Sequence, residues 1–163
     1  MHLRQYTPDD QAACLAIFAS NTPDYFALSE QSEFATFLAE QSSPYFVVVE
    51  SPSNLVACGG FFRIPHAPVA ILTWGMVWRP RHQQGIGSFL LWQRLQQIAQ
   101  DPALLSVRLQ TSQHTARFFE KAGFTIEEVI KDGFGAGLDQ YSMQLALDSP
   151  SRERIAQANA ILT

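Results

Sequence analysis

Two glycines stand in front of a long apolar segment and directly behind a cluster of cationic side chains. Gly85 and Gly87 open the stretch GIGSFLLWQRL, and Arg79, Arg81 and His82 precede them. Glycine lets the backbone approach an anion closely, and the first turn of a helix offers unpaired N–H groups and a positive dipole. The segment therefore predicts a seat for a phosphate or pyrophosphate group, the alternative being a plain loop in front of a core helix.

Two common nucleotide-binding motifs are excluded at this position. No Gly-Lys-Ser/Thr follows, as a P-loop requires, and the third glycine and downstream acidic residue of the dinucleotide fingerprint do not occur. Arg79 and Arg81 fit two roles equally, either as ligands of phosphate groups or as solvated loop charges.

The segment 77–87 resembles the main motif of the GNAT superfamily of acyl-CoA-dependent N-acetyltransferases, V-x-P-x-x-R/Q-x-x-G-x-G/A. Val77 and the two glycines, Gly85 and Gly87, keep the residues of the family. The chain departs from the motif at two positions, because Arg79 stands at the proline and His82 at the Arg/Gln position.

A second segment, 112–124, resembles the other family motif, N-x-x-A-x-x-L/F-Y-x-x-x-G-F. Ser112 takes the asparagine position and Gly123 the final glycine. Phe119 stands where the family commonly has a tyrosine that protonates the departing thiolate, and phenylalanine cannot donate a proton. Tyr141, in a later strand, is the candidate substitute, with a half-buried sheet residue as the alternative.

The resemblance implies acetyl-CoA as co-substrate. Backbone amides from Gln83 to Ser88 would hold the pyrophosphate, and main-chain groups of Met76 and Val77 would meet the pantetheine arm and the acyl carbonyl. Gly75 would occupy the bulge that parts two strands, and Ser112 would bond the pantetheine arm or cap a helix. The residues implied in cofactor binding are Met76, Val77, His82, Gln83, Gln84, Gly85, Ile86, Gly87, Ser88, Ser112 and Phe119.

Acetyl transfer to an amine requires a neutral nucleophile, a stabilised oxyanion and a leaving thiolate. Removing a proton from a lysine-like amine with a pKa of about 10.4 costs roughly 4 kcal/mol near neutral pH, whereas a thiol with a pKa of about 8.5 costs roughly 1.5 kcal/mol. Deprotonating the amine is therefore the larger energetic demand, and a general base matters more than a proton donor for the thiolate. Glu33 is the candidate base, with Asp24 as an alternative; both could instead be solvated charges. Strand amides near Val77 would stabilise the oxyanion.

The elements that must position these residues follow from periodicity and turn residues. Strands are predicted at 1–7, 44–51, 54–64, 68–78, 104–111, 125–131 and 139–147, the last two around the glycine-rich loop 132–137. Helices are predicted at 7–21, 29–41, 87–100, 112–124 and 149–162. This order predicts an α/β, GNAT-like layered fold with a mixed, mostly antiparallel sheet of about seven strands and helices on both faces. We expect one domain over 1–147, with 148–163 as a C-terminal helical tail packed on it or at an interface.

Composition limits the function classes. A net charge of −4 gives no global attraction for nucleic acid, and no apolar run reaches the roughly 18 residues that span a membrane. Cys14 and Cys58 lack metal-ligand spacing and are expected to be buried reduced thiols in a cytoplasmic protein. The sequence predicts an N-acetyltransferase that moves acetyl from acetyl-CoA to a primary amine of a small molecule or peptide, by direct attack through a tetrahedral intermediate. A non-catalytic acyl-CoA-binding module and a protein-interaction role of the C-terminal helix are the alternatives, and a homodimer is left open.

Overall fold

The computed structural model describes residues 1–40, 43–51 and 54–162. Within these residues the strands are β1 (His2–Gln5), β2 (Tyr45–Ser51), β3 (Asn54–Arg63), β4 (Val69–Val77), β5 (Ser106–Thr111), β6 (Thr125–Gly135) and β7 (Leu138–Ala146). The α-helices are α1 (Gln11–Ser20), α2 (Gln31–Ala39), α3 (Ile86–Ala99), α4 (Ala116–Lys121) and α5 (Ser149–Leu162), with 3-10 turns η1 (Pro8–Asp10), η2 (Leu28–Glu30) and η3 (Arg79–Arg81). The end of the predicted helix 29–41 and the turn of the first hairpin reach into 41–42 and 52–53, outside the described residues.

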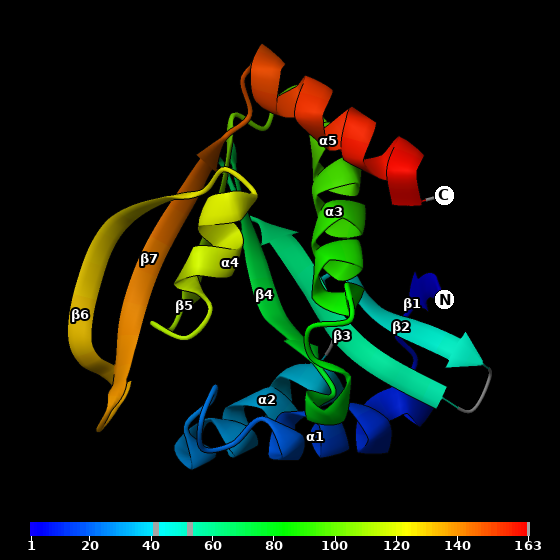
Figure 1. Ribbon diagram of the computed structural model, residues 1–163, viewed down its shortest axis with the longest axis vertical. Coiled ribbons are helices and arrows are strands. Elements are labelled where there is room, and N and C mark those ends of the chain that lie inside the picture. The colour runs from blue at the N-terminus through cyan, green and yellow to red at the C-terminus, as the bar shows by residue number, and fades with distance from the viewer. Residues whose placement is uncertain (41–42, 52–53, 163) are drawn as a thin grey trace. The chain divides into compact units, whose positions relative to one another are not determined.

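The strands form one hydrogen-bonded sheet in the order β1-β2-β3-β4-β5-β7-β6, labelled in Figure 1. β4 and β5 are parallel, whereas β1 and β2, β2 and β3, β5 and β7, and β6 and β7 pair in antiparallel fashion. The prediction of a seven-stranded, mostly antiparallel sheet flanked by helices is confirmed.

The chain folds as two compact units. The first contains Met1–Phe61 and Thr73–Gln93, and the second contains Phe62–Leu72 and Arg94–Thr163. The first unit therefore holds the end of β4, the glycine segment and the start of α3. The second holds β5, β6, β7, α4 and α5.

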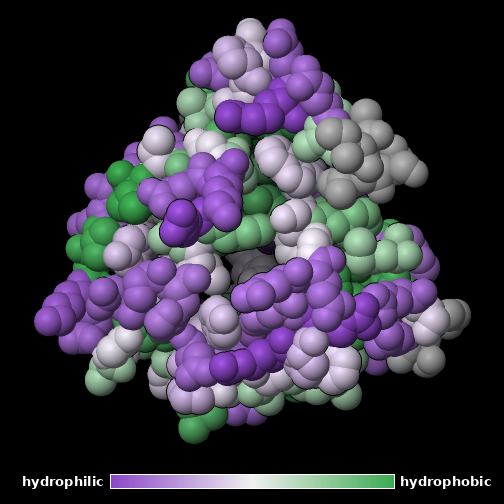
Figure 2. Space-filling view, viewed as in Figure 1, coloured by the Kyte–Doolittle hydropathy of each residue, from purple (hydrophilic) through white to green (hydrophobic). Residues whose placement is uncertain are grey.

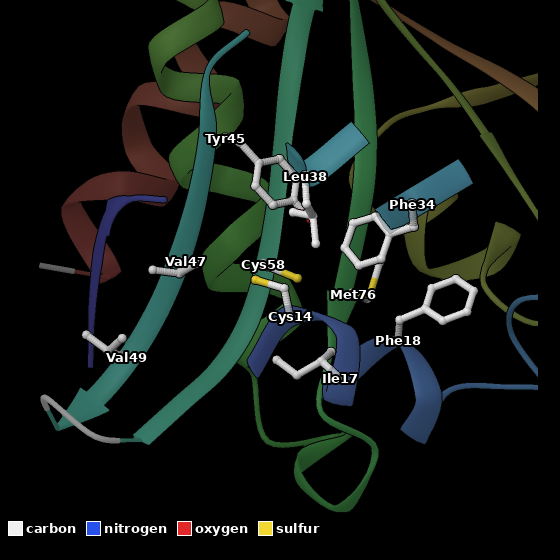
Figure 3. Close-up of a cluster of buried hydrophobic side chains, with 10 residues drawn as sticks. All are labelled: Cys14, Ile17, Phe18, Phe34, Leu38, Tyr45, Val47, Val49, Cys58 and Met76. Atoms are coloured by element: carbon white, nitrogen blue, oxygen red, sulfur yellow. The ribbon is translucent and has the colours of Figure 1, made fainter. Parts of the chain in front are cut away.

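The core of the first unit is built from apolar faces of α1 and α2 packed on β2, β3 and β4, as Figure 3 shows. Its buried members are Cys14, Ile17, Phe18, Phe34, Leu38, Tyr45, Val47, Val49, Cys58 and Met76. Each fully buried side chain of Phe or Ile size contributes about 1.5–3 kcal/mol. This packing fixes α1 and α2 against the end of β4, where the predicted cofactor groups lie.

The two cysteines are free and fully buried, as predicted, and their sulfur atoms lie close together in Figure 3. A hydrogen bond with Cys58, reinforced by burial, raises the pKa of the Cys14 thiol, so that thiol stays protonated. Both cysteines therefore act as small apolar core residues.

The entry into α1 depends on a buried carboxylate. Asp10 accepts two hydrogen bonds of 2.7 Å from the Arg4 guanidinium and one of 2.9 Å from the Thr7 backbone N–H. The hydrogen bonds from Arg4 hold the pKa of Asp10 below its usual range. Asp10 thereby joins β1 to the start of the helical segment, which divides into η1 and α1 where the sequence predicted one helix.

In the second unit β7 lies between β5 and β6. Its Tyr141 pairs with Thr111 of β5 and Val129 of β6. β6 continues to Gly135, so the predicted glycine-rich loop 132–137 is wrong in extent: most of it is strand, and the turn is confined to Ala136 and Gly137. Asp132 closes this hairpin by accepting the Gly137 N–H at 2.6 Å.

α4 is shorter than the predicted helix 112–124. It begins at Ala116, because residues 112–115 form a turn in which the Ser112 carbonyl accepts the N–H groups of Thr115 and Ala116. The helix ends at Lys121, and Gly123, with a φ of +100°, takes the predicted place of a glycine just after the helix cap. The N–H groups of Gly123 and Phe124 bond the carbonyls of Glu120 and Phe119, the pattern of a Schellman cap.

α5 is anchored at its first turns, by Arg152. The guanidinium donates to the carbonyls of Ala99 at 2.6 Å, Leu104 at 2.7 Å and Leu147 at 3.1 Å. A cation at the C-terminal end of α3 satisfies carbonyls that the helix itself leaves unpaired. The predicted C-terminal helix is thus confirmed and held by a specific side chain.

The surface is mixed in polarity. On the face shown in Figure 2, hydrophilic residues cover much of the surface and the hydrophobic areas lie between them. Over the described part of the chain, no helix combines the length and apolar character needed to cross a membrane.

Candidate functional site

The glycine segment in front of α3 forms an open cradle of backbone. Gln83 and Gly85 both adopt left-handed conformations, with φ of +61° and +80°. The Gly85 carbonyl accepts the Phe89 N–H at 2.9 Å and so begins the helix. The amides of the next residues, Ile86, Gly87 and Ser88, have no partners within the helix and lie at its positive end. A Cβ added at Gly85 would meet no protein atom within 4 Å, so the cradle has room for a bound group.

The two arginines in front of the cradle are ion-paired within the first unit. Arg79 lies 2.5 Å from an Asp24 carboxylate oxygen, and its guanidinium sits 5.6 Å from the centre of the Tyr25 ring. Arg81 binds both carboxylate oxygens of Glu50, and its hydrogen bond is the main cause of the lowered pKa of Glu50. The sequence left two roles open, phosphate ligand and solvated loop charge; in this structure both arginines instead brace the loop through ion pairs with carboxylates. Asp24, considered as a base, is engaged in that bracing.

His82 turns back toward the strand that precedes it. Its Nε2 lies 3.0 Å from the Val77 carbonyl oxygen, which also accepts a 2.9 Å hydrogen bond from the buried Asn21 amide. A carbonyl oxygen has two lone pairs, and both are used here. The Val77 carbonyl oxygen is therefore not free to accept a hydrogen bond from a cofactor. Tyr25 packs edge-on against the His82 ring at 5.1 Å.

The backbone of β4 is irregular next to the predicted bulge residue. The sequence places a strand bulge at Gly75, and the preceding residue, Trp74, has a left-handed φ of +42°. A tryptophan in this conformation is strained, and such strain persists only where packing over-determines it. Four phenylalanine rings surround the Trp74 ring at centroid distances of 5.0–6.4 Å: Phe18, Phe26, Phe34 and Phe37. Met76 buries its side chain in the same core, which leaves main-chain groups as its contribution to a site.

Glu33, the predicted base, is exposed on the first turn of α2. A carboxyl group that the sequence reading missed lies one turn before it. Burial raises the pKa of Glu30, and the nearby Glu33 adds to the effect. Glu30 also accepts the Ala27 N–H at 2.8 Å, which ties it to the start of η2. A carboxyl with a raised pKa is a candidate for proton transfer. Nothing in the sequence pointed to Glu30, because its burial depends on the folded chain and not on its neighbours in sequence.

The remaining predicted residues lie in the second unit. Ser112 is buried ahead of α4, and because that helix begins at Ala116, Ser112 is not its N-cap. Phe119 packs edge-on against Phe118 at 5.0 Å and Phe124 at 5.7 Å. Tyr141 is half-buried in β7. Of the predicted residues, the structure thus brings Met76, Val77 and His82–Ser88 together in the first unit, and it places Ser112, Phe119 and Tyr141 in the second.

Comparison with known proteins identifies the family. The model of the acetyltransferase (GNAT) family matches residues 14–124, which is more than half of the chain. The chain belongs to this family. Membership confirms the enzyme class and the co-substrate, acetyl-CoA, that the sequence predicted. A search of the curated proteins found no match to this chain.

Solved structures share the fold at low sequence identity. A putative GNAT acetyltransferase from Desulfovibrio desulfuricans is 20% identical with a TM-score of 0.76, over 90% of this chain and 99% of its own. An aminoglycoside 6'-N-acetyltransferase complexed with coenzyme A is 15% identical with a TM-score of 0.72, over 91% and 98%. A putative acetyltransferase from Salmonella typhimurium, solved with acetyl-CoA, is 19% identical with a TM-score of 0.69, over 91% and 95%.

Proposed function

We propose that this protein transfers an acetyl group from acetyl-CoA to a primary amine of a small molecule or peptide. The observation that carries the proposal is the open backbone cradle of Gln83 and Gly85 at the start of α3, in a chain of the GNAT family. Amides at a helix start suit a pyrophosphate, because they combine hydrogen-bond donors with the positive helix dipole.

The proposed cofactor contacts in the first unit are main-chain groups. Amides from Gln83 to Ser88 would hold the pyrophosphate, and main-chain groups of β4 around Met76 and Val77 would meet the pantetheine arm and acyl group. His82 would shape the cradle through its contact with Val77 rather than by its charge. Ser112 and Phe119 complete the proposed set of cofactor-binding residues.

Bound acetyl-CoA supplies the acetyl group as an activated thioester. In the proposed reaction the amine nitrogen forms a bond to the acyl carbon, the carbon–sulfur bond breaks, and its electron pair leaves on sulfur. Glu33 is the proposed base that takes the amine proton, and Tyr141 is the proposed donor to the thiolate. Freeing the amine costs roughly 4 kcal/mol against roughly 1.5 kcal/mol for the thiol, so the base step should dominate the pH dependence.

The test is release of free thiol from acetyl-CoA in the presence of a broad panel of amines. We expect turnover that rises with pH between 6 and 9 on a lysine-like amine, because the neutral amine is the nucleophile. A flat profile over that range would contradict this chemistry. The cytoplasmic location expected from the sequence stays a prediction, which cell fractionation can test.

A non-catalytic acyl-CoA-binding module is the second candidate, and Phe119 favours it. The residue lacks the hydroxyl that would protonate a leaving thiolate. Tight binding of acetyl-CoA without thiol release on any amine would support this candidate over the first.

A further inference from the structure

Tyr45 crosses the sheet toward β4 from two strands away. It is paired with Gly60 of β3, and a Cβ at Gly60 would lie 2.6 Å from Tyr45 Cδ2 and 2.3 Å from the Pro44 carbonyl oxygen. Contacts that short do not occur between real atoms, so the Tyr45 ring can lie across β3 only because residue 60 has no side chain. Figure 3 shows the ring reaching from β2 over β3.

The phenol is held rigidly in this position. Tyr45 is 3% exposed, and its ring contacts those of Phe37 at 5.1 Å, Tyr6 at 5.8 Å and Phe34 at 6.5 Å. Its hydroxyl donates a 3.0 Å hydrogen bond to the carbonyl oxygen of Trp74. This is the left-handed residue of β4, and the hydrogen bond fixes the plane of the peptide that joins Trp74 to Gly75.

The orientation of that peptide determines where the next amide points. In a trans peptide the C=O and the N–H point in opposite directions. The Gly75 N–H therefore points away from the Tyr45 hydroxyl and the aromatic core. Gly75 is exposed and has no side chain, so a bound group can reach its backbone.

We infer that Tyr45 is a positioning residue for acetyl transfer: by binding the Trp74 carbonyl it aims the Gly75 N–H at the oxygen of the acyl group. The inference rests on the proposed function. A preorganised amide donor stabilises the negative charge that develops on this oxygen when the amine attacks. Tyr45 itself touches neither substrate, and it acts only through the backbone of β4.

The first test compares Tyr45→Phe with a matched control, Tyr6→Phe. Tyr6 also donates its hydroxyl to a backbone carbonyl, that of Leu38 at 3.3 Å, within the same aromatic cluster. Both variants keep the ring and lose one hydroxyl. We expect Tyr45→Phe to lower kcat about tenfold, below the 10²–10³-fold loss typical of deleting an oxyanion donor because the amide itself remains. The Kd for acetyl-CoA should stay within about twofold, and Tyr6→Phe should keep wild-type kcat.

The second test does not need turnover. Protein labelled with ¹⁵N-glycine gives resonances from nine glycines, and the Gly75 signal is assigned with Gly75→Ala. Coenzyme A lacks the acyl carbonyl that acetyl-CoA carries. The Gly75 amide proton should therefore shift with acetyl-CoA more than with coenzyme A in wild type and Tyr6→Phe, and this difference should shrink in Tyr45→Phe.

The outcomes separate the two proposals. Equal kcat in Tyr45→Phe and Tyr6→Phe overturns the inference, as does a wild-type Gly75 signal that does not distinguish acetyl-CoA from coenzyme A. If no amine is acetylated but the Gly75 difference appears and depends on Tyr45, the proposed function fails; the part of the inference that stands is that Tyr45 orients the Gly75 amide toward the acyl oxygen.

Discussion

Replacing Gly85 with alanine tests whether the cradle before α3 is the pyrophosphate seat. The residue has a φ of +80°, and a Cβ there would meet no protein atom within 4 Å. The added methyl group therefore causes no clash in the free protein. It does carry a conformational penalty, because the left-handed region is strained for alanine, and in the proposed site it would stand beside the bound pyrophosphate.

Gly137 provides a matched control. It has a φ of +77°, and a Cβ there would also find open space, but it lies in the β6–β7 turn. A left-handed alanine costs roughly 1–2 kcal/mol. Reduced freedom of the unfolded chain offsets about 0.4–1 kcal/mol of that. Both variants should therefore lose about 1 kcal/mol of stability, a fall in Tm of roughly 2–4 °C for a chain of this length.

Binding should separate the two variants. Hydrogen bonds to a charged group contribute about 1.5–3 kcal/mol each. If the methyl group keeps the pyrophosphate from one or two amides, the loss is about 3 kcal/mol, a roughly 100-fold rise in Kd. Isothermal titration with coenzyme A at one fixed salt concentration should show this rise for Gly85→Ala and a wild-type Kd for Gly137→Ala. Similar Kd values for both variants, with equal stability losses, would refute the placement of the seat.

Three further predictions concern catalysis and stability. Phe119→Tyr should fold normally and change kcat by less than about threefold if Tyr141 or water protonates the thiolate, since that step costs only about 1.5 kcal/mol; an inactive wild type beside an active variant would instead indicate a binding module. Glu33→Gln should lower kcat/KM about 100-fold on a lysine-like amine, as expected for loss of a general base, and an unchanged pH–rate profile would exclude Glu33 from that role. Asp10→Asn should lower the free energy of unfolding by about 2 kcal/mol at pH 7 through its lost charged hydrogen bonds to Arg4. Because the folded-state pKa of Asp10 is depressed, this difference is complete above the unfolded-state pKa of about 3.9 and should fade as pH falls through the folded-state value. Denaturant unfolding at pH 7 and at acid pH measures the stability difference between the wild type and Asp10→Asn. A difference that grew in acid would contradict the lowered pKa of Asp10.

Local sequence predicted those features whose partners are close along the chain. The turn before α3 lies next to the helix that follows it, so one short segment predicted both the helix and the glycine segment in front of it, in which Gly85 is left-handed. The same holds for the end of α4, where Gly123 supplies the left-handed residue of the Schellman cap. The element order followed from periodicity and turn residues for the same reason, and the family motifs were read as a resemblance carried by two short segments.

Long-range contacts decided what the sequence pattern left open. Arg79 and Arg81 are braced by Asp24 and Glu50, carboxylates from distant segments that no local pattern connects to them. Asn21 reaches the Val77 carbonyl across 56 positions in the chain.

The left-handed residue of β4 shows most clearly what local sequence does not predict. Glycine adopts this conformation without strain, and the sequence places only a bulge at Gly75; the left-handed residue is its neighbour Trp74. Its ring is enclosed by phenylalanines from other elements, and its carbonyl is bound by Tyr45, 29 residues earlier in the chain. Propensity ranks residues by what each costs alone, whereas the folded chain selects the arrangement whose packing and hydrogen bonds together outweigh the local strain.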